Sequence, residues 1–254
     1  MAKRPLSLRI ASRQYAFVRE ANDVHIFLTQ ALPLLEKAKE EYGASKRKKD
    51  RRYYVPSIRR TKIARRNDNE LKSIYDRFIT RSLYETFLVM GVSQFESFLA
   101  DVLKEVFFEY PRKLGVSLSG IAPCRQVALE VLLDATDLNE AIEDAIEQHL
   151  SSVFFAGPHE YLAYVEKVVG VNFPVEERDT YVELKATRDL VVHGLGAINA
   201  LYLSKAGGKA RGGLEDEVVV DAKYFGDALA TMKRLAGVVK RDAENAFPRR
   251  KKGN

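Results

Sequence analysis

The sequence contains a single cysteine, Cys124, among its 254 residues. One cysteine excludes an internal disulfide framework and is typical of a protein in the reducing cytosol. No apolar run approaches the roughly 20 residues that a membrane-spanning helix requires. The charged N-terminus is not followed by the continuous apolar stretch of a secretion signal. We therefore expect a cytoplasmic protein that has no membrane partner.

Motifs for metals and nucleotide cofactors are also lacking. The four histidines include no His-x-x-Glu-His spacing, and there is no second cysteine to help build a metal site. His149 and His159 flank a Gly-Pro pair without a cysteine near them in the sequence. Neither a Walker A loop nor a Gly-x-Gly-x-x-Gly turn is present. The sequence predicts no metal site and no cofactor.

The positive charge is concentrated in two segments. Residues 46–66 hold eleven Lys or Arg against one Asp, and residues 249–252 are all basic, although the net charge of the whole chain is only +6. The rest of the chain is therefore acidic. Such a separation of charge favours a polyanion partner that is bound by specific basic arms.

Apolar residues recur at helical spacing through most of the chain. With 46% hydrophobic residues, this predicts an all-α protein with a single domain over 1–254, built as a bundle of four principal helices. The principal helices are expected over about 9–41, 70–110, 176–203 and 222–239, the last with Asp221 as its N-cap. A helical insertion over 112–175 is expected to contain short helices at 125–135, 138–150 and 159–169.

Three segments are expected to fall outside the helices. We expect residues 43–69 to form a basic loop. The alternative is that Tyr53–Val55 forms a short extended piece within it. Val218–Val220 suits a short strand. The basic tail 247–254 is expected to be disordered.

The most informative stretch is Thr187-Arg-Asp-Leu-Val-Val-His-Gly194. Arg188 is a permanent cation, and His193 can exchange protons near neutral pH. The two side chains lie roughly 140° apart around a straight helix, so one helix alone makes a poor catalytic site. Two copies packed about a two-fold axis could gather both pairs in one cleft, and we therefore expect a homodimer.

The pattern Arg-polar-x-x-x-His followed by Gly resembles the signature of the HEPN superfamily (higher eukaryotes and prokaryotes nucleotide-binding). The segment 83–107, with Phe95-Glu96-Ser97-Phe98-Leu99, also looks like the second helix of HEPN subfamilies from prokaryotic defence systems. The resemblance is sharp over 185–194 and architectural over the four principal helices. It does not extend to 112–175.

The resemblance implies a metal-independent endoribonuclease that acts as a homodimer, and a role as a toxin or antiviral effector. In such enzymes the ribose 2′-OH attacks the adjacent phosphate. His193 would act as general acid or base, and Arg188 would stabilise the phosphorane. Asp189 occupies the polar position, where family members often carry Asn, and is the third catalytic candidate. Glu183 lies roughly where several such proteins place an acidic residue.

The basic segment supplies the candidate RNA-binding residues. Cations bind phosphates, and aromatic rings can stack on unpaired bases. The alternative is a solvated run of charge without a ligand. The candidates are Lys46, Arg47, Lys48, Lys49, Arg51, Arg52, Tyr53, Tyr54, Arg59 and Arg60.

Other interpretations stay open at this point. Arg19 and His25 form a near match to the motif with one more residue between them. Arg188 and Asp189 could be a solvated ion pair and His193 a histidine favoured at a helix end. The chain could also be a non-catalytic nucleic-acid-binding module, or one subunit of a toxin–antitoxin pair that binds an antitoxin or regulatory protein.

Overall fold

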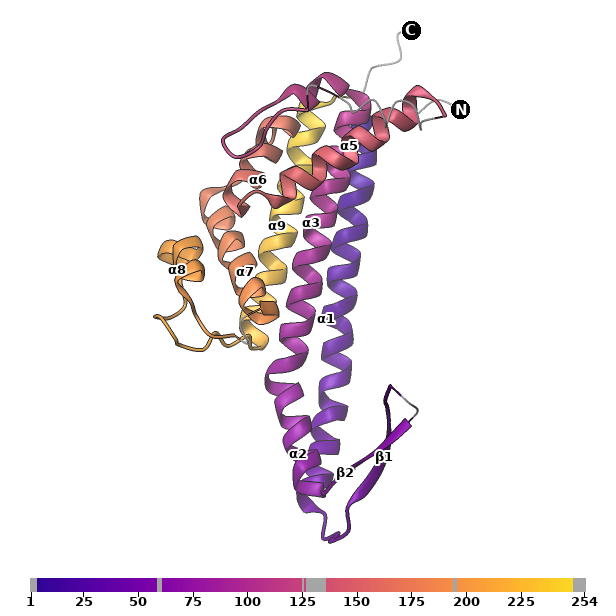
Figure 1. Cartoon of the computed structure of the whole chain (residues 1–254), viewed down its shortest axis with the longest axis vertical. Coiled ribbons are helices and arrows are strands. Elements are labelled where there is room, and N and C mark those ends of the chain that lie inside the picture. Colours follow the sequence, from indigo (N-terminus) through magenta and orange to yellow (C-terminus); the bar gives the residue numbers. More distant parts are fainter. Residues whose placement is uncertain (1–3, 59–60, 125, 127–135, 194–195, 249–254) are drawn as a thin grey trace.

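The chain folds into an elongated all-α structure with one small two-stranded sheet (Figure 1). The structure, a computed structural model, describes residues 4–58, 61–124, 126, 136–193 and 196–248. The predicted fold class is confirmed. Its long elements are α1 (Leu6–Ala44), α2 (Asp68–Arg77), α3 (Leu83–Glu109), α7 (Val175–His193) and α9 (Ala222–Ala246).

The axis of the molecule is formed by α1 and by one continuous helix over 68–109. A π-helical segment, η1 (Phe78–Ser82), joins α2 to α3 without a break. α1 packs along α2, α3 and α9, and α7 packs against α3 and α9. The N-cap predicted for α9 is confirmed, since the Asp221 side chain accepts a hydrogen bond of 2.8 Å from the Tyr224 amide.

The core is centred on α3, because this helix is covered by neighbours on several sides. Most of its apolar side chains are buried, and those with no exposed surface include Leu88, Val92, Leu99 and Val102. Aromatic rings join the helices here: Phe17 of α1 stacks on Phe98 at 5.7 Å, and Phe95 lies 4.8 Å from Tyr181 of α7 between ring centroids. Burial of such rings supplies most of the stabilisation of a bundle.

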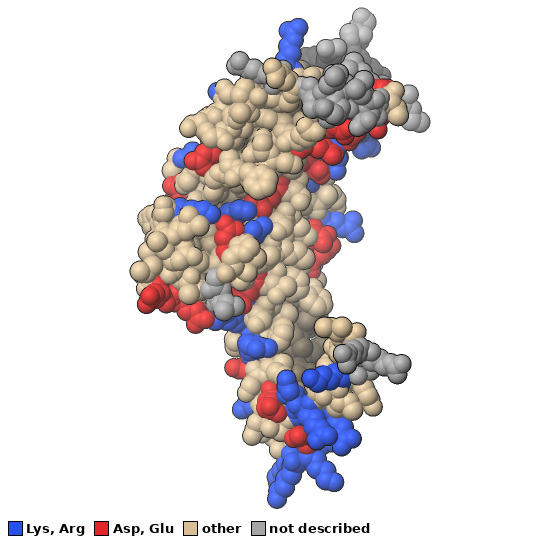
Figure 2. Space-filling model, viewed as in Figure 1, with Lys and Arg blue, Asp and Glu red and all other residues tan. Residues whose placement is uncertain are grey.

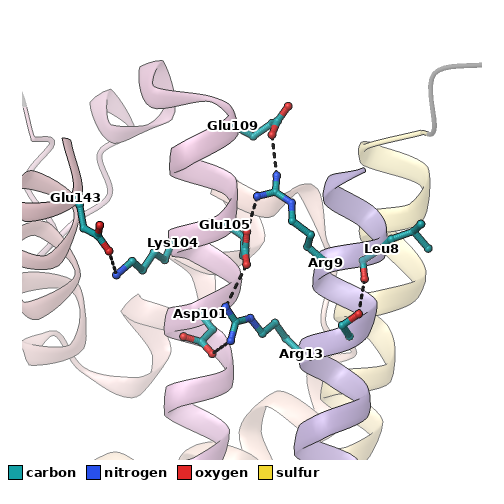
Figure 3. A network of polar contacts seen from close by, with 9 residues as sticks. Leu8, Arg9, Arg13, Asp101, Lys104, Glu105, Glu109 and Glu143 are labelled. Atoms are coloured by element: carbon teal, nitrogen blue, oxygen red, sulfur yellow. Dashed lines mark hydrogen bonds and ion pairs between the residues drawn. The ribbon is translucent and has the colours of Figure 1, made fainter. Parts of the chain in front are cut away.

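A network of ion pairs fixes α1 against α3 at the end away from the sheet (Figure 3). Arg9 bridges Glu105 and Glu109 at 2.6 and 2.7 Å, and Arg13 bridges Asp101 and Glu105 at 3.1 and 3.2 Å. Partly exposed pairs of this kind each contribute about 1 kcal/mol or less. The network therefore sets the register of the two helices more than it stabilises them.

The segment 112–175 is a set of shorter elements, as predicted, laid across the same end of the bundle. Lys104 of α3 holds the longest of them through Glu143 at 2.7 Å. The helix expected over 125–135 lies outside the described residues, apart from Gln126, which is not helical. The elements are η2 (Pro111–Gly115), α5 (Leu138–Phe155), α6 (Pro158–Val165) and η3 (Glu166–Gly170).

The prediction of a basic loop over 43–69 was wrong, whereas the alternative, a short extended piece at Tyr53–Val55, is confirmed because β1 includes it. The structure contains an antiparallel hairpin of β1 (Arg51–Pro56) and β2 (Thr61–Arg66), in which Arg52 lies opposite Arg65 and Tyr54 opposite Ile63. Tyr, Val and Ile favour extended backbone. Their preference prevails over the disorder suggested by the many charges.

The motif helix is shorter than predicted, since α7 ends at His193 and does not reach Leu203. Gly196 adopts φ +86°, which a glycine tolerates without strain, and the chain turns there. A separate helix, α8 (Ala200–Ala206), follows, with Asn199 as its N-cap. The prediction of a strand over Val218–Val220 was also wrong. These residues are not in a strand, and the β-pairing next to them is a single isolated bridge between Ala197 and Glu217.

The end of the chain is ordered further than expected. α9 continues to Ala246, and Phe247 is buried and stacks on Tyr110 at 5.5 Å. Burial of an aromatic ring explains why the disorder predicted from residue 247 was wrong there. The basic residues 249–252 lie outside the described part of the chain.

One helix, Asp68–Glu109, is long and apolar enough to cross a bilayer by length and composition. The core helix of a soluble bundle has the same composition, and this helix packs against α1, α7 and α9. No unbroken apolar run of that length occurs in the sequence, because a few charged residues interrupt the apolar residues of this helix.

Candidate functional site

The last two turns of α7 carry all three predicted catalytic residues. Arg188 and Asp189 are half-buried, and His193 is exposed at the end of the helix. A guanidinium nitrogen of Arg188, Nη1, donates to Asp189 Oδ1 at 3.0 Å. The other, Nη2, lies 3.5 Å from Glu96 Oε2 of α3. Arg188 is thus held between a neighbour on its own helix and one across the core.

Glu96 also forms an ion pair with a second cation, since Lys185 Nζ lies 2.5 Å from its other carboxylate oxygen, Oε1. Beneath these charges lie Tyr161 and Tyr181, both fully buried. Burial, with the charge of Glu96 added, raises the pKa of Tyr181 well above its ordinary value. The Arg188 side chain is therefore surrounded at its root by closely packed, largely apolar groups, which limit how far its guanidinium can move.

His193 lines a pocket of about 240 Å³ beside this cluster. Asp189 shares the pocket, since residues four positions apart lie on one face of a helix. Lys205 of α8 also lines it, and its Nζ lies 3.2 Å from Asp189 Oδ2. Arg188 is not among the lining residues, which are Ala186, Asp189, Leu190, His193, Asn199, Leu201, Tyr202 and Lys205.

The carboxylate of Asp189 is therefore shared between Arg188 outside the pocket and Lys205 inside it. Within one chain Arg188 and His193 do not line the same cavity, as the helical geometry predicts. The near match elsewhere in the chain is different in kind, since Arg19 pairs with Asp23 at 3.9 Å and His25 is exposed on α1.

Glu183 points away from the pocket and is only 3% exposed. Its carboxylate accepts hydrogen bonds from Thr187 at 2.6 Å, from Tyr202 at 2.8 Å and from Tyr224 at 2.7 Å. These donors come from α7, α8 and α9. Glu183 thus positions α8, and with it Lys205, against the motif helix.

Two members of this site were not predicted from the sequence. Lys205 lies beyond the turn at Gly196, and no spacing rule relates it to Asp189. Glu96 was noted only within the segment that resembles the second helix of HEPN subfamilies, and its pairing with Arg188 follows from the packing of α3 on α7. In the described ranges, no three His, Cys, Asp or Glu side chains group as metal ligands.

The predicted RNA-binding residues lie near one end of the long axis, away from the α7 site, where Lys and Arg side chains gather on the surface (Figures 1 and 2). Arg51 is bound to Asp68 at 2.6 and 3.2 Å, and its guanidinium lies 5.1 Å from the centre of the Tyr42 ring. The Arg51 side chain therefore anchors the hairpin to the helices and is not free to bind RNA. Arg59 and Arg60 lie outside the described residues.

The other candidates in this region are exposed. They are Lys46, Arg47, Lys48, Lys49, Arg52, Tyr53 and Tyr54. Of the two tyrosines, Tyr54 is the more open, at 76% against 37% for Tyr53.

No protein-family model matches this sequence, and neither a curated protein nor a solved structure is significantly similar to it.

Proposed function

We propose that this protein is a metal-independent endoribonuclease of HEPN type that acts as a homodimer. The observation that carries the proposal is the α7 site: Asp189 and His193 line one open pocket with Lys205, and Arg188 is fixed beside it. A proton-exchanging group in a pocket that also holds the cation of Lys205 suits cleavage of a phosphodiester.

The reaction uses a nucleophile that RNA itself provides. The ribose 2′-OH loses its proton to a base, a bond forms between the 2′-oxygen and the adjacent phosphorus, and the bond from phosphorus to the 5′-oxygen breaks. The products are a 2′,3′-cyclic phosphate and a free 5′-OH. His193 exchanges the protons, and Arg188 stabilises the charge on the phosphorane oxygens. Lys205 adds a second positive charge on the pocket side.

A dimer can bring together the two catalytic side chains that point in different directions on a single helix. Arg188 and His193 face different directions on α7, so one copy offers them to different surfaces. Two α7 helices packed about a two-fold axis can present Arg188 of one copy to the cleft that holds His193 of the other. The resemblance further implies a toxin or antiviral effector, held in check by an antitoxin or regulatory protein.

The test is cleavage of total tRNA and of a labelled single-stranded RNA in EDTA, analysed on a denaturing gel. We expect wild type to cut and His193→Ala to lose activity by at least about a hundredfold, with an unchanged circular dichroism spectrum. His159→Ala is the matched control, because His159 is an exposed histidine outside the site. Cleavage by His193→Ala at the wild-type rate would contradict the proposal.

A second candidate function is RNA binding without catalysis. It is favoured by the hairpin, where exposed cations and a nearly free Tyr54 lie together. A native-gel shift of RNA by wild type and by His193→Ala, without cleavage by either in the presence of EDTA or of magnesium, would select this function.

A further inference from the structure

The two faces of the hairpin differ sharply. Arg52, Tyr54, Ile63 and Arg65 share one face, because they pair across the strands at alternate positions. All four are exposed, Ile63 at 47%. Neither strand contains an acidic residue, and the exposed segment 46–49 leads into this region. The outer face is therefore a basic surface with an aromatic and an aliphatic side chain at its centre.

The opposite face holds the hairpin in place. Arg51 pairs with Asp68 at the start of α2 and lies over the ring of Tyr42 near the end of α1. Asp68 is only 5% exposed, so this anchor is set into the body of the protein. The outer face is consequently presented on a fixed support.

We propose that this outer face is a second RNA site, separate from the α7 pocket, which binds an unpaired stretch of RNA. Tyr54, supported by Ile63 across the ladder, stacks on a base. Arg52 and Arg65 bind the flanking phosphates. The binding is independent of catalysis, whereas its effect on cleavage rests on the proposed function.

The distance between the two sites defines the substrate. Asp68 and Glu96 are 28 residues apart on one continuous helix, which corresponds to about 42 Å at 1.5 Å per residue. β1 runs back along this helix (Figure 1), and the three residues from Arg51 to Tyr54 cover about 10 Å. Tyr54 therefore lies roughly 30 Å or more from the Arg188 cluster.

A strand stacked as in a helix rises about 3.4 Å per nucleotide and needs roughly nine nucleotides to span that distance, whereas a fully extended single strand needs about five. RNAs of about four nucleotides can therefore reach one site only. The substrate class is RNA with an unpaired segment and at least about five nucleotides between the segment bound by the hairpin and the bond that is cut.

The first arm of the test measures binding of fluorescent oligouridines of 4 and 24 nucleotides to full-length protein carrying His193→Ala, so that the RNA stays intact. We expect Tyr54→Ala to weaken binding of the 24-mer about tenfold. Arg52→Ala with Arg65→Ala should lower the slope of log Kd against log salt by roughly two. The controls are Tyr15→Ala, an equally exposed ring, and Arg112→Ala with Lys240→Ala.

The second arm measures cleavage with His193 intact. The hairpin variants should slow cleavage of the 24-mer about tenfold at low RNA concentration and leave cleavage of the 4-mer unchanged. Equal binding of the 24-mer by wild type and hairpin variants would overturn the hairpin site. Hairpin-dependent binding without any cleavage would support the hairpin site and remove the nuclease. Hairpin-dependent binding to phosphatidylserine vesicles, with none to oligouridine, would overturn the assignment to RNA.

Discussion

The buried carboxylate of Glu183 determines how the candidate site is assembled. An ionised carboxylate only accepts hydrogen bonds, so it can satisfy three hydroxyl donors from three helices at once. Burial, together with the charge of Glu183, raises the pKa of Tyr202 to about 12. This hydroxyl therefore remains a donor throughout the neutral pH range, and the junction of α7 and α8 keeps its form.

Replacement of Glu183 by Gln should destabilise the fold, because an amide offers one acceptor oxygen and a donor group that the hydroxyls oppose. We expect the free energy of unfolding to fall by about 1–3 kcal/mol, and Tm to fall by roughly 2–4 °C for each kcal/mol. Thermal unfolding followed by circular dichroism measures this. Glu20→Gln, at an exposed position of α1, is the control, and equal Tm values for the two variants would refute the role of Glu183.

At the scale of the element, the hairpin depends on one ion pair. Hydrogen bonds from the Arg51 guanidinium hold the pKa of Asp68 at about 2, below its ordinary value of 3.8. A carboxyl whose pKa is lowered by folding stabilises the folded form above its unfolded pKa. The anchor is therefore complete above about pH 4 and is lost as the pH falls toward 2.

Asp68→Asn should release the hairpin while the bundle stays folded. We expect trypsin to cut within 46–66 several-fold faster at pH 7 than in wild type, since a loosened hairpin exposes its many Lys and Arg bonds. Asp76→Asn, on an exposed turn of the same helix, is the control, and trypsin should cut this variant at the wild-type rate. Hydrogen-exchange protection of the hairpin amides should fall between pH 4 and 2 in wild type only. Identical digestion of the two variants would show that the ion pair does not anchor the hairpin.

The long helices could be predicted from the sequence because apolar spacing alone determines which face of each is buried. The hairpin could be predicted only in part. An extended piece at Tyr53–Val55 was foreseen as an alternative to a loop, but the density of charge in 46–66 hid the preference of Ile63 for extended backbone and with it the second strand. The end of α7 was missed because Leu201 and Leu203 continue the apolar spacing, whereas the turn at Gly196 interrupts the helix.

The candidate site was predictable to the same extent. Arg188, Asp189 and His193 follow from one short pattern on one helix, and their relative directions follow from helix geometry. The pairing of Lys205 with Asp189 arises when α8 folds back on α7, and that of Glu96 with Arg188 when α3 packs on α7. Both contacts depend on tertiary structure, which no local spacing encodes.

At the scale of the whole molecule, the basic hairpin lies near one end of the long axis and the α7 site lies part-way along it (Figures 1 and 2). The chain outside residues 46–66 and 249–252 is acidic in net charge. An RNA is thus attracted to the basic hairpin and to the cations of the α7 site, and less so to the protein surface that lies between these two sites. This arrangement favours two separated points of contact over one continuous groove.

The division of Arg188 and His193 between two directions makes the dimer testable by complementation. If Arg188 of one copy acts with His193 of the other, a heterodimer of Arg188→Ala and His193→Ala keeps one complete pair and loses both members of the second pair. Such heterodimers, isolated by tandem affinity tags, should cleave RNA at about half the wild-type rate, while each homodimeric variant is inactive. A heterodimer without activity, beside active wild type purified in the same way, would show that both residues must come from the same copy. Failure of the two tagged chains to co-purify would refute the dimer itself.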